Sequence, residues 1–211
     1  NEYQHLAEAV GGTYLSISLN SDFRINPFDL PASVADEDPA DILRSAVISL
    51  LGLMGLILGK LDPTEEALLD KAIWATYAKK DISETSDFRT AEMPIMSDLI
   101  EVLNGIVGAE SLAQRLEKFT SGTFAGLLNQ PTNVQLNNQL LIFSIRDLED
   151  QLRPIAMYII LGHIWNLVRS EMKKRILVLD EAWIMMQHED SARFVFGIAK
   201  RARKYYLGLT T

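Results

Sequence analysis

The 211-residue sequence contains no cysteine, no internal repeat and no low-complexity segment. The absence of cysteine excludes disulfide bonds and any metal site built from thiolates. With 28 acidic and 20 basic residues, the chain is neither a disordered acidic tail nor a generally basic nucleic-acid-binding protein. The chain begins with Asn1 and shows no targeting segment at its start, so we expect it to be part of a longer protein.

Charge is distributed unevenly along the sequence. Residues 1–100 carry 17 acidic and 7 basic side chains, whereas residues 172–211 carry 4 acidic and 8 basic ones. A basic segment at the end of an acidic protein indicates either a site for an anion or a solvated helix face. Charge alone leaves both interpretations open.

A series of helical patterns covers residues 38–119 and is followed by a loop at 120–133 that is rich in Gly, Asn, Thr and Pro. We call residues 38–133, with this linker loop, the helical block. Two helices are predicted to begin at Pro39 and Pro63, each directly after a capping Asp. Two further helices are predicted at 97–104 and 110–119. Within the first helix, residues 46–59 are apolar or small throughout. This run is shorter than the roughly 18 to 20 residues that cross a bilayer, which favours a helix buried against its neighbours over a membrane segment.

Short β-rich segments lie on both sides of the helical block, in what we call the strand-bearing region, residues 1–37 and 134–211. Strands are predicted at 14–19, 140–145, 176–179 and 206–210, and helices at 2–10, 151–172 and 191–204. Apolar strands that alternate with helices indicate a parallel sheet covered on both faces. The predicted fold class is α/β, with the helical block inserted into the strand-bearing region.

Two adjacent carboxylates, Asp180 and Glu181, follow the strand predicted at 176–179. Ligands of open α/β sheets bind at the carboxyl ends of the strands. In P-loop NTPases an apolar strand ends in the same pair, where the Asp orients hydrated Mg²⁺ and the Glu polarises the attacking water. Asp180 and Glu181 are therefore candidates for these two roles. The alternative is a solvated strand end at which the acids only stop the strand.

The sequence lacks the glycine-rich loop that holds the phosphates of ATP in such enzymes. The nearest match, Gly55 to Lys60, has its glycines too close together and is followed by Leu61 instead of Ser or Thr. We interpret this segment as the end of a helix. If the protein is an ATPase, we expect its phosphate loop upstream of Asn1 and expect residues 1–211 alone not to hydrolyse ATP.

A few residues of conspicuous type favour structural roles. His163 lies in an apolar helical pattern, and the sequence contains only three histidines, so a histidine-based metal cluster is not expected. We expect Trp74, Trp165 and Trp183 to lie in the core or at contacts between subdomains.

Three segments together resemble the motor ATPases of type IV secretion and conjugative transfer, in the FtsK/HerA branch of RecA-like P-loop NTPases. They are Glu2-Tyr3 with Gly11-Gly12 leading into Ile25-Asn26-Pro27-Phe28-Asp29, then Leu177 to Trp183, then Lys200 to Lys204. The resemblance implies a RecA-like core with an inserted helical subdomain, ATP as nucleotide and Mg²⁺ as cofactor. On the matching Walker B strand, Asp180 would bind Mg²⁺ through water and Glu181 would be catalytic. The family's γ-phosphate-sensing glutamine would follow Thr211.

The resemblance also gives the basic segment 200–204 a possible role. Motor ATPases of this branch form hexameric rings in which an arginine of one subunit reaches the γ-phosphate bound by its neighbour. Arg203 matches the basic motif best, ahead of Lys200, Arg201 and Lys204. The alternative is a solvated helix face that binds nothing.

The resemblance implies an ATPase domain that energises assembly or substrate transfer in a secretion or conjugation machine. It also implies a location at the cytoplasmic face of the cell membrane, with proteins of that machine as partners. One alternative is a DNA-translocating or DNA-processing ATPase of the same branch, which would need a basic loop facing DNA, although residues 1–171 are acidic. Another is a nucleotide-independent scaffold built on a degenerate NTPase fold.

Overall fold

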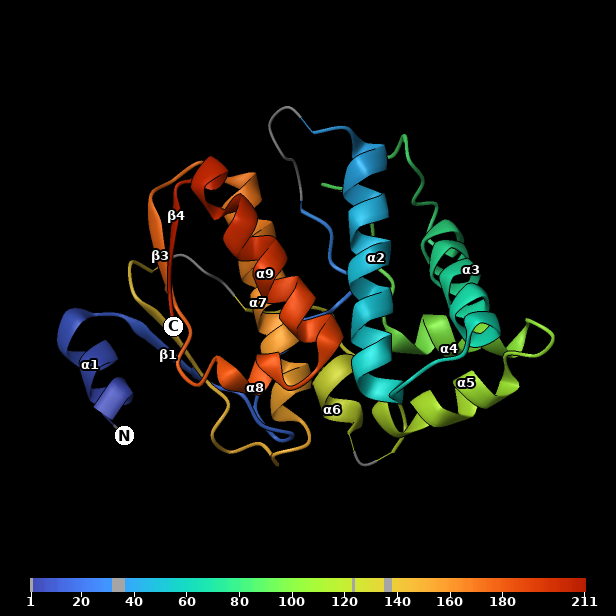
Figure 1. Ribbon diagram of the computed structural model, residues 1–211, viewed down its shortest axis with the longest axis horizontal. Helices are drawn as coiled ribbons and strands as arrows, with labels where there is room; N and C mark the ends of the chain where they lie inside the picture. Colours follow the sequence, from blue (N-terminus) through green and yellow to red (C-terminus); the bar gives the residue numbers. More distant parts are fainter. Residues whose placement is uncertain (1, 32–36, 123, 135–137) are drawn as a thin grey trace.

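The computed structural model describes residues 2–31, 37–122, 124–134 and 138–211 (Figure 1). The helices are α1 (Glu2–Val10), α2 (Pro39–Leu58), α3 (Pro63–Lys79), α4 (Met96–Asn104), α5 (Glu110–Leu116), α6 (Ala125–Leu128), α7 (Arg153–Ser170), α8 (Trp183–Met186) and α9 (Glu189–Ala202). The strands are β1 (Thr13–Ser16), β2 (Leu141–Ser144), β3 (Arg175–Val178) and β4 (Leu207–Thr210), and 3-10 turns cover Glu117–Phe119 and Arg203–Tyr205. All the predicted elements are present, although β1, β2 and β4 are shorter than predicted and β3 begins and ends one residue earlier. The short helices α6 and α8 were not predicted.

The described strands form two separate parallel pairs. In the first pair, β1 lies beside β2, with Thr13 opposite Leu141 and Ser16 opposite Ser144. In the second pair, β3 lies beside β4, with Arg175 opposite Leu207 and Val178 opposite Thr210. Both pairs are parallel, as predicted for strands joined through helices.

The prediction that helices cover both faces of the sheet is wrong for β3. Ile176 and Val178, which point to the same face, are 78% and 65% exposed, whereas Leu177 packs against the core. The described helices α7 and α9 lie on one side of the β3–β4 pair (Figure 1). An apolar run is typical of a strand buried on both faces, but the sequence of the run does not show whether a covering element is there.

Capping residues set the start of the two long helices in the helical block. The Asp38 side chain accepts a hydrogen bond from the backbone N–H of Ala40 at 2.9 Å. At the start of α3, Asp62 accepts from the N–H of Glu65 at 2.9 Å, and the Glu65 carboxylate accepts from the N–H of Asp62 at 3.0 Å. Gly59, with φ of 78°, ends α2, which confirms that the segment Gly55 to Lys60 is a helix end.

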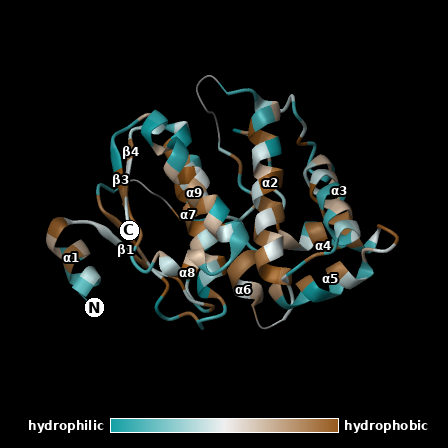
Figure 2. Ribbon diagram, in the orientation of Figure 1, coloured by the Kyte–Doolittle hydropathy of each residue, from teal (hydrophilic) through white to brown (hydrophobic). Residues whose placement is uncertain are grey.

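The helix α2 packs against α3 and α5 of the helical block and against α7 and α9 of the strand-bearing region. Its length and composition would allow it to cross a membrane. Of its most apolar stretch of 18 residues, 33% is buried inside the structure. Leu43, Leu50 and Met54 are buried and belong to one apolar core that also includes residues of α3 and β4. Hydrophobic residues run along much of α2 in Figure 2. The predicted packing of α2 against neighbouring helices is confirmed. Because both regions share this core, the domain division at residues 37/38 and 133/134 stays a prediction.

The Asn-Pro-Phe-Asp segment joins the two regions. Asn26, which is 3% exposed, donates a hydrogen bond from Nδ2 to the carbonyl of Pro94 at 2.8 Å. Phe28 is fully buried, and its carbonyl accepts a hydrogen bond from the Tyr77 hydroxyl at 2.9 Å. The segment that contributes to the family resemblance therefore anchors the helical block to the strand-bearing region.

The three tryptophans differ in burial. Trp165 is 5% exposed and lies in the core, and Trp74 is partly buried and packs against it, as expected. Trp183 is 60% exposed, so the expectation for this residue is wrong. Trp183 is the first residue of the one-turn helix α8, which buries Ile184 and Met185 and leaves the side chain of Trp183 in solvent.

Candidate active site

The turn after β3 carries the two predicted acids. The N–H of Leu179 still pairs with the carbonyl of Thr210 at 2.8 Å, and α8 begins at Trp183. Asp180 and Glu181 therefore lie at the carboxyl end of a parallel strand, directly before a helix. This position agrees with the prediction from the sequence and is the edge at which α/β sheets bind ligands.

Glu181 has a left-handed backbone conformation, with φ of 56°. A non-glycine residue occupies this region at a cost in free energy and persists there only when its surroundings hold it. Its N–H donates to Oδ1 of Asp180 at 3.0 Å, and its carbonyl accepts from the N–H of Ile184 at 3.0 Å. The Glu181 side chain is exposed, and its carboxylate makes no hydrogen bond or ion pair with the described part of the chain.

Asp180 is held from a second direction by α1. The hydroxyl of Tyr3 donates a hydrogen bond to Oδ2 of Asp180 at 2.8 Å. This hydrogen bond, together with the negative charge of Asp180, raises the pKa of Tyr3. The two carboxylates of the turn therefore differ: both oxygens of Asp180 have protein donors, and the carboxylate of Glu181 is free to meet a ligand.

Comparison with known proteins identifies the family. Residues 1–210 match the family model of the TraG P-loop domain. The chain belongs to the TraG P-loop domain family. A solved structure of VirB4 of Thermoanaerobacter pseudethanolicus matches with a TM-score of 0.85 and 23% identity, over 100% of this chain and 83% of that chain. No curated protein matches the chain.

These matches confirm two predictions from the sequence. The family match supports the resemblance to motor ATPases of type IV secretion and conjugative transfer, and the likeness to VirB4 supports the α/β fold of a P-loop NTPase. The assignment of individual site residues rests on the geometry of this TraG P-loop domain alone.

The oxygen atoms at the turn suit a magnesium ion that is shared with a nucleotide. Among the residues that the structure describes, no group of three or more His, Cys, Asp or Glu side chains converges to hold a metal. Mg²⁺ in nucleotide sites is typically held by one or two carboxylates, by phosphates and by water, and does not need a cage made of protein alone. Asp180 fits such a site, because it is exposed at the strand end and its carboxylate keeps lone pairs that accept no hydrogen bond from the described residues.

Arg203 lies near the amino ends of β3 and β4, at the opposite end of the strand pair from Asp180 and Glu181. It begins the 3-10 turn that precedes β4, whereas Asp180 follows the carboxyl end of β3, and the two strands are parallel. The structure therefore does not bring Arg203 together with Asp180 and Glu181 of the same chain. Its exposed guanidinium makes no hydrogen bond or ion pair with any described residue, unlike Arg201, which donates to the carbonyl of Gly197 at 3.0 Å.

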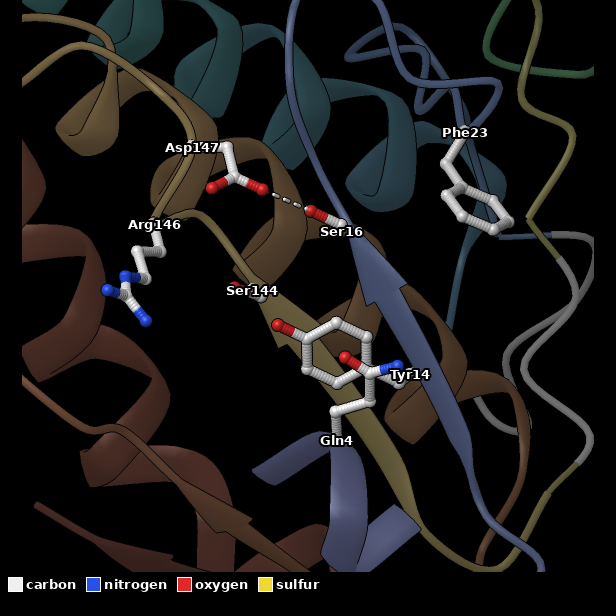
Figure 3. A pocket seen from close by; sticks show the side chains of 7 residues that line it. All are labelled: Gln4, Tyr14, Ser16, Phe23, Ser144, Arg146 and Asp147. Atoms are coloured by element: carbon white, nitrogen blue, oxygen red, sulfur yellow. Dashed lines mark hydrogen bonds between the residues drawn. The ribbon is translucent and has the colours of Figure 1, made fainter. Parts of the chain in front are cut away.

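A polar cleft that the sequence did not predict lies at the carboxyl ends of β1 and β2 (Figure 3). It has a volume of about 580 Å³ and is lined by Gln4, Tyr14, Ser16, Phe23, Ser144, Arg146 and Asp147. The Ser16 hydroxyl donates to Oδ2 of Asp147 at 2.9 Å, and the Arg146 side chain extends away from this pair. Arg146 and Asp147 directly follow the apolar strand predicted at 140–145, and this position of charged side chains at a strand end could have indicated the cleft.

Proposed function

We propose that this TraG P-loop domain belongs to a motor that hydrolyses ATP to energise assembly or substrate transfer in a type IV secretion or conjugation machine. The motor would act at the cytoplasmic face of the cell membrane, together with other proteins of that machine. The observation that carries the proposal is the turn after β3, where Asp180 is held by two donors and Glu181 is exposed in a strained backbone conformation.

The two carboxylates would perform different tasks. Asp180 would hold Mg²⁺ through a water ligand, and bound Mg²⁺ would neutralise charge on the phosphates of ATP. Glu181 would accept a hydrogen bond from the attacking water and orient it toward the γ-phosphate. Since the Glu181 carboxylate has no partner among the described residues, no existing contact has to be broken before it meets that water.

Replacement of Glu181 by Gln in the full-length protein tests this role. The amide keeps the size of the side chain, but its neutral oxygen accepts a weaker hydrogen bond than a carboxylate and polarises the attacking water less, so we expect ATP turnover to fall at least about 100-fold while ATP still binds. The matched control is Glu189→Gln, since Glu189 is also exposed and makes an ion pair with Arg193 on the surface of α9. Normal turnover in Glu181→Gln would remove the catalytic role of Glu181, whereas absence of ATP turnover in the wild-type full-length protein would favour a nucleotide-independent scaffold.

We further propose that Arg203 acts on the nucleotide of a neighbouring subunit in a homohexameric ring. The position of Arg203 supports this proposal. It lies at the end of the strands opposite to Asp180 and Glu181, where its guanidinium is available to an adjacent subunit. Arg203→Ala should lower turnover with little change in the affinity for ATP.

Mixed oligomers distinguish a contribution between subunits from one within a subunit. Oligomers made only of Glu181→Gln subunits or only of Arg203→Ala subunits should each have low turnover. When they are mixed, some interfaces pair an intact Glu181 with an intact Arg203 of the neighbour, so part of the activity should return. If mixing restores nothing, Arg203 does not act between subunits.

A further inference from the structure

The hydrogen bond between Tyr3 and Asp180 connects two parts of the structure that share no strand pairing. Tyr3 belongs to α1, which packs against β1 and β2, whereas Asp180 follows β3. The described strands form two pairs with no ladder between them. The 2.8 Å contact from the Tyr3 hydroxyl to Oδ2 of Asp180 therefore links α1 and the β1–β2 pair directly to the turn of the candidate active site.

The donors around Asp180 fix the plane of its carboxylate. Oδ1 accepts from the N–H of Glu181 at 3.0 Å, and Oδ2 accepts from Tyr3. The Glu181 donor lies in the same turn and moves with Asp180, so it cannot fix the carboxylate relative to the rest of the fold. Tyr3 approaches from a different element and can. A carboxylate has about four lone-pair directions, so two remain open after these bonds form.

We propose that Tyr3 is a positioning residue that orients the Asp180 carboxylate, so that its remaining lone pairs face the water ligands of a nucleotide-bound divalent cation. This inference rests on the proposed metal-binding role of Asp180. Outer partners that orient a metal-binding group typically change metal affinity by about 10- to 100-fold when they are removed. The Tyr3 hydroxyl stands in that relation to the site.

The variant Tyr3→Phe in the full-length protein removes one oxygen atom and keeps the ring. Because the Tyr3 side chain is half exposed, the loss of its hydroxyl leaves no buried gap, and the melting temperature should stay the same. The matched control is Tyr206→Phe, since Tyr206 is similarly exposed and its hydroxyl bonds to no described side chain.

The decisive measurement is Mn²⁺ binding in the presence of a non-hydrolysable ATP analogue, followed by electron paramagnetic resonance of the free ion. We expect Tyr3→Phe to weaken Mn²⁺ binding about 10-fold. The affinity for the analogue in the presence of EDTA should be unchanged, and Tyr206→Phe should behave like the wild type. The Mg²⁺ concentration that gives half-maximal ATP turnover should rise in parallel for Tyr3→Phe.

Asp180→Asn separates the two ways in which the expectation can fail. If Asp180→Asn abolishes Mn²⁺ binding but Tyr3→Phe binds like the wild type, the positioning role of Tyr3 is wrong and the proposed metal site stands. If neither variant changes Mn²⁺ binding, the proposed function of Asp180 is itself wrong. A lower melting temperature together with weaker analogue binding in EDTA would show that Tyr3 is structural, which also overturns the inference.

Discussion

The helical block and the strand-bearing region differ in how many of their large apolar side chains are exposed. Among the described residues, the large exposed apolar side chains of the helical block are Ile48 and Val107. Those of the strand-bearing region are Tyr3, Leu6, Val10, Met172, Ile176, Val178, Trp183, Met186, Phe196 and Tyr206. Exposed apolar patches typically mark contact sites. The region that carries the candidate active site is therefore also the one with apolar surface available for contacts.

The spacing of these residues shows that the exposure is organised. Tyr3, Leu6 and Val10 are three and four residues apart and so lie along one side of α1, and Ile176 and Val178 share one face of β3. The helical block closes its apolar surface on itself and on α7 and α9, whereas the strand-bearing region leaves one helix side and one strand face open. Substitutions in the two regions test this contrast.

Leu69→Ala and Ile176→Ala compare a buried position of the helical block with the open face of β3. Leu69 is fully buried, so its truncation should lower the free energy of unfolding by about 3 kcal/mol. Ile176→Ala should lower it by less than about 0.5 kcal/mol, because the side chain is already in water. Denaturant unfolding of both variants measures the difference. Equal losses would mean that Ile176 is covered in solution and that the contrast between the regions does not hold.

Glu37→Gln weakens a buried contact within the strand-bearing region. Glu37, the last residue of this region before the helical block, accepts hydrogen bonds from Arg169 of α7 and from Tyr205. Arg169 is buried, so the loss of the charge opposite it should cost about 2 kcal/mol, less than for a fully buried pair because Glu37 is partly exposed. The control Glu84→Gln, in an exposed pair with Arg44, should cost less than about 0.5 kcal/mol. Equal costs for the two variants would refute the structural role of Glu37.

The same contact of Glu37 should make stability depend on pH. Burial alone would raise the pKa of Glu37, but the hydrogen bonds from Tyr205 and Arg169 and the charge of Arg169 lower it below its ordinary value. The stabilisation is therefore complete above the pKa of Glu in the unfolded chain and is lost as pH falls through the lower folded value. Unfolding curves below about pH 5 should show this acid sensitivity in the wild type and less of it in Glu37→Gln.

Helix caps also differ between the regions. Asp62 caps α3 through its side chain, whereas His188 at the start of α9 forms no such bond. We expect Asp62→Ala to lower the free energy of unfolding by about 1 kcal/mol and His188→Ser to raise it by about 0.5 kcal/mol. The extended backbone of His188, with φ of −121° and ψ of 132°, already suits a capping residue. A loss of stability in His188→Ser would contradict this prediction.

The smallest effect is expected at Asp29, in the segment that joins the regions. Burial raises the pKa of its carboxyl group, although hydrogen bonds with Thr132 and Asn26 act in the opposite direction. The folded state thus holds this proton more tightly than the unfolded state, and stability falls as pH rises through the folded pKa. Asp29→Asn should slightly raise stability at pH 7 and flatten the decline above pH 4, unlike the exposed control Asp22→Asn. A decrease at pH 7 would contradict this expectation.

The local sequence was sufficient to predict most helices and strands and the turn that carries Asp180 and Glu181. The capping residues Asp38 and Asp62, each followed by a proline, located α2 and α3, since capping depends on neighbouring residues only. The apolar run before Asp180 and Glu181 located the turn after β3 for the same reason. The one-turn helices α6 and α8 could not be predicted, because elements of four residues carry too little periodicity and are held by packing.

Apart from α6 and α8, the order of the helices and strands follows from the sequence, as do the resemblance to conjugative and secretion motor ATPases and the place of Asp180 and Glu181 at a strand end. The tertiary structure, in contrast, brings Tyr3 to Asp180 and Glu37 to Arg169, and places Arg203 away from the acids of its own chain. It also decided that one face of β3 is open. The physical reason is that caps and strand ends depend on neighbours along the chain, whereas contacts and burial depend on elements brought together from distant positions.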